Sequence, residues 1–204
     1  MTRRSAAACV VTMLGVAACR QPPEVAFVTD RFEIAPEFEG ELCGGNVAFM
    51  EARLAEIEEL LGIEARGKIR YNWVEDISGF CPDSASACAD GTTIYGPWSL
   101  FEHELVHAVA ASMGQAKPFL AEGLAVAFSA PMLAPGSMMP SDWLDFDPLE
   151  TQGVDDAYSY ATAGHFVRFL YEEFGAEPLT RLYRMSEPDD SEAQLRGQFE
   201  RVYG

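Results

Sequence analysis

Positive charge is scarce in this 204-residue chain. It contains 14 Lys and Arg residues against 32 Asp and Glu residues, which gives a formal net charge of −18 at pH 7. Binding to phosphate groups depends on clustered lysines and arginines. We therefore expect no nucleic-acid partner, and no binding to an anionic lipid surface through the protein's own charges.

Long apolar runs are also lacking. The run AAACVVTMLGVAA at 6–18 is too short for a membrane-spanning helix, which needs about 20 apolar residues. Arg3 and Arg4 precede it, and this layout is typical of a secretory signal. Its end, Val16-Ala17-Ala18-Cys19, resembles a bacterial lipobox, in which the cysteine is lipidated and becomes the mature N-terminus. Ordinary cleavage nearby, with a free Cys19, is the alternative.

These features predict three segments. Residues 1–18 form the lipoprotein signal peptide, 19–24 a tether and 25–204 a single domain. Acyl chains on Cys19 would hold the protein on a membrane without crossing it. Arg20 stands after the cysteine where an aspartate would favour inner-membrane retention, so we expect a bacterial envelope lipoprotein at the outer membrane.

Cysteine is limited to five residues, of which Cys9 lies in the signal. An exported protein can keep a disulfide. The turn-rich segment Cys81-Pro-Asp-Ser-Ala-Ser-Ala-Cys88 makes Cys81 with Cys88 the first choice. Pairing of Cys43 with either of them stays open, because connectivity does not follow from sequence. No CxxC accompanies these residues, so a cysteine-based metal site is not expected.

Only three histidines are present, and two of them fall in the HExxH segment at 103–107. Side chains four apart lie on one face of a helix, so His103 and His107 can bind one ion. Zinc suits two imidazoles and prefers four ligands. Glu122, in the next apolar helical segment, could supply a third, which leaves one position for water. Glu104 could then take a proton from that water, and the pattern predicts a zinc-dependent hydrolase, most simply a peptidase.

Glu102 is the other carboxylate near the motif. It precedes His103 and would point away from the zinc-binding face, so we interpret it as a solvated or N-terminal helix charge.

Periodicity and turn residues predict a mixture of strands and helices, hence an α+β fold. A long loop without period at 131–157 is a candidate lid. The expected strands are 25–34, 68–74 and 92–95, and the expected helices are 45–62, one from Ser99 to Gly114, one around Glu122, 158–174, 178–185 and 191–203.

Three segments, HELVH, PFLAEGLAVAF and YATAGHFVRFLYEEFG, resemble the gluzincin metallopeptidases, in particular the peptidase MA-like and minigluzincin group. The similarity covers about residues 68–185. It implies a thermolysin-like (zincin) core with a small mixed sheet, an HExxH helix and a helical C-terminal half. It also implies His103, His107 and Glu122 as zinc ligands and Glu104 as general base. In such proteins the edge strand pairs with an extended substrate, and 92–95 is the segment expected to do so here.

The same resemblance points to Tyr160, in the pattern Y-x-x-A-G, as a catalytic donor to the tetrahedral oxyanion. Tyr158 is the weaker candidate. His165, where relatives often have a small residue, could support the site from outside the ligand group, but it does not share a helix face with Tyr160. The alternatives are a packed aromatic for Tyr160 and a partly exposed helix histidine for His165.

Two functions therefore remain from the sequence. The first is a lipid-anchored zinc peptidase acting on peptide or protein substrates. The second is a catalytically silent zinc-binding lipoprotein that binds a peptide or protein. Glu104 favours the enzyme, because a structural zinc site needs only its ligands. A structural site also usually has a fourth protein ligand, and no Cys or His stands in place to supply one here.

Overall fold

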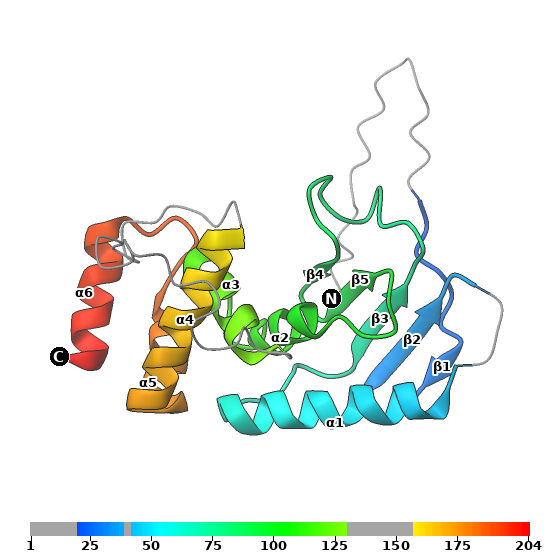
Figure 1. Ribbon diagram of the computed structural model, residues 1–204, viewed down its shortest axis with the longest axis horizontal. Coiled ribbons are helices and arrows are strands. Elements are labelled where there is room, and N and C mark those ends of the chain that lie inside the picture. The colour runs from blue at the N-terminus through cyan, green and yellow to red at the C-terminus, as the bar shows by residue number, and fades with distance from the viewer. Residues whose placement is uncertain (1–19, 39–41, 130–156) are drawn as a thin grey trace, which may run out of the picture.

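The computed structural model describes residues 20–38, 42–129 and 157–204. The expected signal, Cys19 and the expected loop up to residue 156 lie outside these ranges. Within them the protein is α+β, with a sheet half and a helical half joined through helix α2 (Figure 1). None of the helices in these ranges is long and apolar enough to cross a membrane.

The sheet is small and mixed. Its strand order is β1-β2-β3-β5-β4, with β2, β3 and β5 parallel and an antiparallel strand at each side. Buried apolar side chains on β2, β3 and β5 form one end of the hydrophobic core. The strands are β1 (Phe27–Val28), β2 (Phe32–Pro36), β3 (Ile69–Trp73), β4 (Cys88–Asp90) and β5 (Thr93–Gly96).

The expected single strand at 25–34 is wrong, because the chain reverses within it. Strand β1 pairs antiparallel with β2, with Phe27 opposite Ile34. The Thr29 hydroxyl accepts a hydrogen bond from the Phe32 backbone N–H at 2.8 Å and stabilises the turn. Alternation alone does not reveal a turn this short.

Helix α1 (Gly44–Leu61) connects β2 to β3 and lies along the lower edge of the sheet half in Figure 1. It confirms the helix expected at 45–62. Gly62 follows it with a left-handed φ of 63°, a conformation that glycine adopts at little cost, and its N–H caps the last turn. Met50, Leu54, Ile57 and Leu61 are its buried apolar residues.

The expected edge strand at 92–95 is interior. Strand β5 lies between β3 and β4, and the outer strand is β4, which the sequence placed in the cysteine loop. Asp90 pairs with Thr93 across a tight turn at Gly91, whose φ is 57°. The Asp-Gly pair is a hairpin signal, and this hairpin gives β5 its outer neighbour.

Helix α2 (Glu102–Ala110) is shorter than expected. Ser99 does not cap it. Phe101 directly precedes its first residue, and no described side chain caps its N-terminus. Residues 111–113 form a turn, and Gly114 follows with φ 110°. Helix α3 (Pro118–Phe128) begins with proline at its first position, where the missing N–H has no partner to lose.

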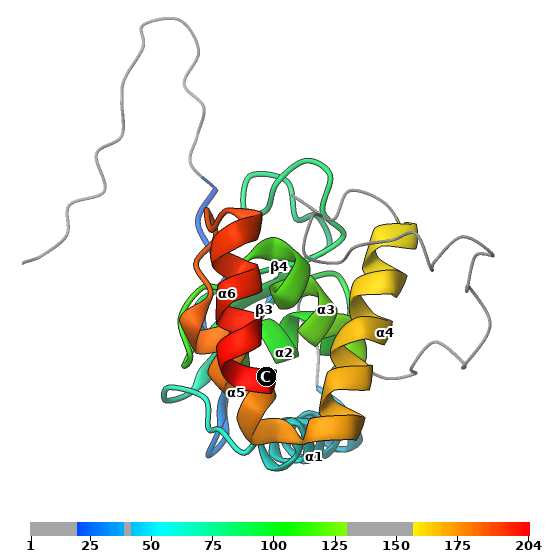
Figure 2. The same cartoon turned by 90° about the vertical axis from the view of Figure 1, so that its left-hand side faces the viewer.

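Helices α4 (Ala157–Phe174), α5 (Ala176–Met185) and α6 (Glu192–Tyr203) confirm the expected helical segments and form the other half (Figure 2). Helices α3 and α4 pack closely because glycines lie at the crossing. A Cβ added to Gly123 would meet the Ala163 carbonyl oxygen at 2.7 Å. A Cβ added to Gly164 would clash with Val126.

Candidate metal centre and cavity

Helix α2 presents both motif histidines on one face. His103 and His107 are one turn apart, and their Nε2 atoms lie 3.2 Å from each other. Leu105, Val106, Ala108 and Val109 are fully buried and hold the opposite faces of the helix in the core. The orientation of the two imidazoles therefore follows from the burial of α2.

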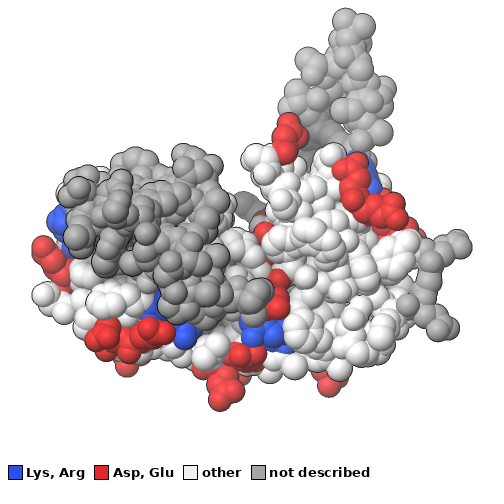
Figure 3. All heavy atoms as spheres, viewed as in Figure 1, with Lys and Arg blue, Asp and Glu red and all other residues white. Residues whose placement is uncertain are grey.

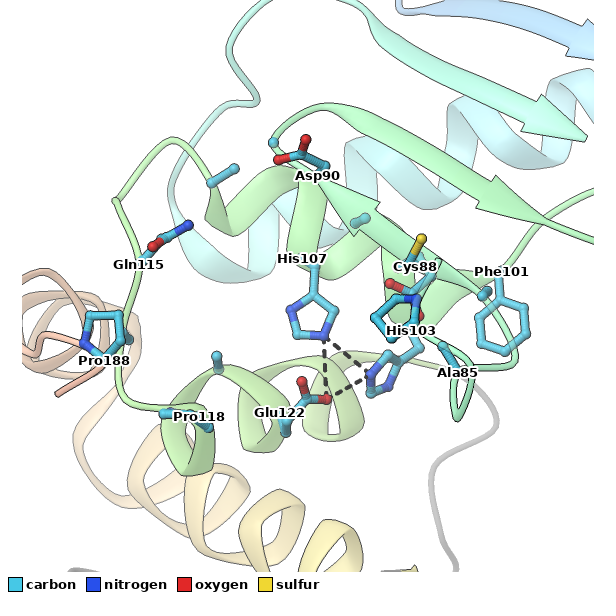
Figure 4. Close-up of a pocket in the computed structure, with 18 of the residues that line it drawn as sticks. Ala85, Cys88, Asp90, Phe101, His103, His107, Gln115, Pro118, Glu122 and Pro188 are labelled. Carbon is cyan, nitrogen blue, oxygen red and sulfur yellow. Dashed lines mark hydrogen bonds and ion pairs between the residues drawn. The ribbon is translucent and has the colours of Figure 1, made fainter. Parts of the chain in front are cut away.

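Helix α3 supplies the third group. The Glu122 Oε2 atom lies 3.0 Å from His103 Nε2 and 3.4 Å from His107 Nε2 (Figure 4). Two bonds hold the start of α3 in place. The buried Lys117 donates from Nζ to the Asp190 carbonyl at 2.8 Å and from its backbone N–H to Ser186 Oγ at 3.0 Å.

The three donor atoms match the spacing that a zinc ion requires. Bonds of 2.0–2.1 Å in a tetrahedron place neighbouring ligand atoms about 3.3 Å apart. The observed separations of 3.0, 3.2 and 3.4 Å lie close to that value. The residues present therefore fit the ion, and among the described residues no other His, Cys, Asp or Glu joins the group.

The charges of the group couple the carboxylate to the imidazoles. Burial would raise the pKa of Glu122, but hydrogen bonds with His103 and His107 outweigh it and lower this pKa to about 2. Burial disfavours the His107 imidazolium, yet its hydrogen bond to Glu122 and the charges of Glu122 and Glu104 raise the pKa of His107. A cation at this point is thus favoured, whether a proton or a metal ion.

Glu104 lies beside the group and does not belong to it. Its side chain is buried, and burial raises the pKa of its carboxyl against the opposing charges of His107 and His103. The backbone of Ala89, in β4, opposes this rise in the pKa. A carboxyl with a raised pKa next to a metal site holds a proton more readily than an exposed one, which suits a general base that must also release its proton.

A cavity of about 960 Å³ opens in front of these residues (Figure 4). Strand β4 and the loop before it form one wall, and α2, α3 and their connection form the other. The described lining includes Asp90, Glu104 and Glu122 but no Lys or Arg.

Two tyrosines reach this cavity from different helices. Tyr160, from α4, lines it with its ring 6.0 Å from that of His103. Tyr183, from α5, lines it too and is 5% exposed. Burial and the charge of Glu122 raise the pKa of Tyr183 to about 12, so its hydroxyl stays protonated. The side chain of Tyr158 lies outside the described residues.

The support from His165 expected from the sequence stays a prediction. His165 is absent from the described cavity lining, and its buried Nε2 atom has no hydrogen-bond partner among the described residues. It lies five positions after Tyr160 on α4, so it points elsewhere.

Glu102 is the first residue of α2, which agrees with the expected N-terminal helix charge, but its side chain is not solvated. Its side chain is 15% exposed, and Oε2 lies 2.8 Å from Arg53 Nε on helix α1. Long-range packing of α1 against α2 supplies this partner, which sequence spacing does not reveal.

The cysteine loop forms part of the cavity wall. A disulfide joins Cys81 and Cys88, and Cys43 is a free, exposed thiol. Cys88 lies in β4, and residues 84–87 line the cavity. The proposed lipidation site, Cys19, lies outside the described residues.

The sequence did not indicate Tyr183 or strand β4 as parts of the site. Tyr183 lies in an ordinary amphipathic helix without a motif. The Asp90-Gly91 pair was the available signal for β4. Comparisons with models of known families, with curated proteins and with solved structures found no match for this chain.

Proposed function

We propose that the protein is a zinc-dependent peptidase with a thermolysin-like core. The observation that carries the proposal is the group His103, His107 and Glu122, with zinc-like spacing on the wall of an open cavity. Structural zinc sites are closed by four protein ligands, whereas catalytic sites keep a position for water. Three ligands facing a cavity favour the catalytic kind.

The chemistry follows from the residues around that position. Zinc would lower the pKa of a bound water toward about 7 and polarise a peptide carbonyl. Glu104 accepts the proton from the attacking water and delivers it to the leaving amine. Its raised pKa suits both steps, since the carboxyl must bind and release a proton within one cycle.

Two further parts of the cavity support substrate binding. Among the described residues, strand β4 is the outer strand of the sheet on the cavity side, so its outward edge could pair with an extended peptide. Tyr160 and Tyr183 also line the cavity, from α4 and α5, and either hydroxyl could donate a hydrogen bond to an oxyanion. The β4 edge thus takes the place of the segment 92–95 expected from the sequence.

The charge of the cavity favours neutral or cationic peptides. Its described walls carry carboxylates without Lys or Arg, and basic side chains form no broad patch on the face shown in Figure 3. We further propose that lipid on Cys19 anchors the domain at the bacterial envelope, on the strength of the sequence pattern at 1–19.

The test compares the lipid-free domain with its Glu104→Gln variant, and with Glu56→Gln as a control at an exposed carboxylate of α1. Bound zinc is measured in each, followed by cleavage of a mixed peptide library. Equal zinc in all three, with cleavage lost only in Glu104→Gln, is the expected result. Zinc without cleavage in the parent supports the silent binding protein, and a parent that binds no stoichiometric zinc refutes the proposal.

A further inference from the structure

Arg53 connects helix α1, which carries none of the three candidate ligands, to α2 and α3, which carry them. It lies on α1, and its side chain is only 12% exposed. The guanidinium contacts three groups, of which one belongs to α1, one to α2 and one to α3.

The contact with α2 is made at the first residue of that helix. Arg53 Nε lies 2.8 Å from Glu102 Oε2, and Glu102 directly precedes His103. Among the described residues no side chain caps the start of α2, and Arg53 Nε makes no hydrogen bond, so this ion pair restrains the first turn through charge attraction.

The contact with α3 is made at the last residue of that helix. Arg53 Nη2 donates a hydrogen bond to the Phe128 carbonyl oxygen at 3.1 Å. The last carbonyls of a helix have no partner within it, and a cation there interacts favourably with the helix dipole. Glu122 lies on the same helix, six residues earlier.

The third contact is made within α1, on its exposed side. Arg53 Nη1 pairs with Glu56, one turn further along α1, whose side chain is largely exposed. Because the guanidinium is planar and rigid, its other nitrogens can face α2 and α3 at the same time without this partner. A lysine ammonium cannot reach both partners with the same geometry.

We propose that Arg53 is a positioning residue of the metal centre: it sets the separation of α2 from α3, and thereby that of His103 and His107 from Glu122. The inference rests on the proposed function only in taking these three residues as metal ligands. Groups that hydrogen-bond to metal ligands typically change metal affinity by 10–100-fold when removed, and Arg53 is one step further from the ligands. Since Arg53 acts through two helices, we expect a loss of about tenfold in Arg53→Met.

The experiment uses four variants of the lipid-free domain. Arg53→Met removes the contacts of Arg53 with both α2 and α3, which together we call the bridge. Arg53→Lys keeps the positive charge but not the several nitrogens of the guanidinium. Glu56→Gln removes the outward partner alone, and Ile57→Val trims the core face of the same helix, so it controls for general destabilisation. Zinc affinity is measured by chelator competition, the Co²⁺ absorption spectrum reports ligand geometry, and hydrogen exchange of the metal-free proteins reports local order.

The expected pattern is specific to the bridge. Arg53→Met loses about tenfold in zinc affinity, changes the Co²⁺ spectrum and exchanges faster in the first turn of α2 and the last turn of α3. Arg53→Lys is intermediate, while Glu56→Gln and Ile57→Val bind zinc like the parent.

Equal zinc affinity in Arg53→Met and the parent would overturn the inference, as would a loss shared equally by Ile57→Val. A parent that binds no zinc would refute the metal centre instead. Hydrogen exchange then tests the contacts of Arg53 without the metal. Faster exchange in Arg53→Met than in the parent, confined to the first turn of α2 and the last turn of α3, supports them. An equal change in exchange rate across all helices overturns the inference.

Discussion

The crossing of α3 and α4 makes Gly123→Ala a sharp test of how the third ligand is held. The added Cβ would lie 2.7 Å from the Ala163 carbonyl oxygen and 2.7 Å from Val167 Cγ2. The backbone carbonyl cannot rotate away, so the two helices must separate. Glu122 is the neighbouring residue and would move with α3.

The magnitude follows from two opposing effects. Overpacking costs about 1–3 kcal/mol, and we expect the upper end because backbone forms the obstacle. Alanine is preferred over glycine within a helix by about 1 kcal/mol, which offsets part of the cost. The net expectation is a loss of about 2 kcal/mol in the free energy of unfolding.

Gly197→Ala is the matched control, since a Cβ at this position of α6 meets nothing within 4 Å. It should gain up to about 1 kcal/mol from helix propensity alone. The two variants then differ by about 3 kcal/mol, or roughly 6–12 °C in Tm for a chain of this size. Thermal and urea unfolding measure the difference. A Gly123→Ala protein as stable as Gly197→Ala would refute the close-packing argument.

Four further predictions concern the site. The pKa of Glu104 is raised in the folded, metal-free protein, so the parent should lose stability as pH rises from the unfolded-state pKa of 4.5 to that raised value. Glu104→Gln should escape this loss. Identical urea-unfolding profiles of the two proteins across that pH range would contradict this prediction. Zinc affinity, measured by chelator competition, should fall as pH drops through the raised pKa of His107, because protons compete for the imidazole; a flat profile would exclude His107 as a ligand. Replacing Cys81 and Cys88 by serine should cost about 2.5 kcal/mol from loop closure and lower peptide cleavage more than zinc content, because the loop lines the cavity; unchanged unfolding and cleavage would show that the disulfide does not constrain this wall. Asp90→Asn should reduce the preference for lysine-containing over glutamate-containing peptides in kcat/KM, with Asp83→Asn as an exposed control outside the cavity lining; equal preference in both variants would remove Asp90 from substrate selection.

Local patterns were the reliable part of the sequence. The amphipathic spacing of α1 and the glycine after it predicted that helix almost to the residue. The HExxH spacing predicted that His103 and His107 share a face, because four residues are close to one helical turn. The short, turn-rich segment between Cys81 and Cys88 favoured the pair that the structure joins. Each of these features depends on residues that are close together in the sequence.

The errors concern features that depend on distant parts of the chain or on segments too short to show a pattern. The segment 25–34 was interpreted as one strand because a two-residue strand and its turn carry little pattern. Strand β5 was expected at the edge from the family resemblance, and its pairing with β4 was missed because it depends on a hairpin across Gly91. Glu102 was interpreted as a solvated or N-terminal helix charge, and its pairing with Arg53 was missed because Arg53 precedes it by 49 residues.

The sequence by itself determined which residue types could form a metal site and that two of them lie on one helix face. Only the tertiary structure decided that Glu122 approaches both imidazoles, that β4 borders the cavity and that Tyr183 reaches it from α5. The physical reason is that helix geometry is set by backbone hydrogen bonds between near neighbours, whereas the distance between α2 and α3 is set by packing. Arg53 and Lys117 bond to residues 75 and 73 positions away along the chain, and sequence spacing does not reveal contacts of that range.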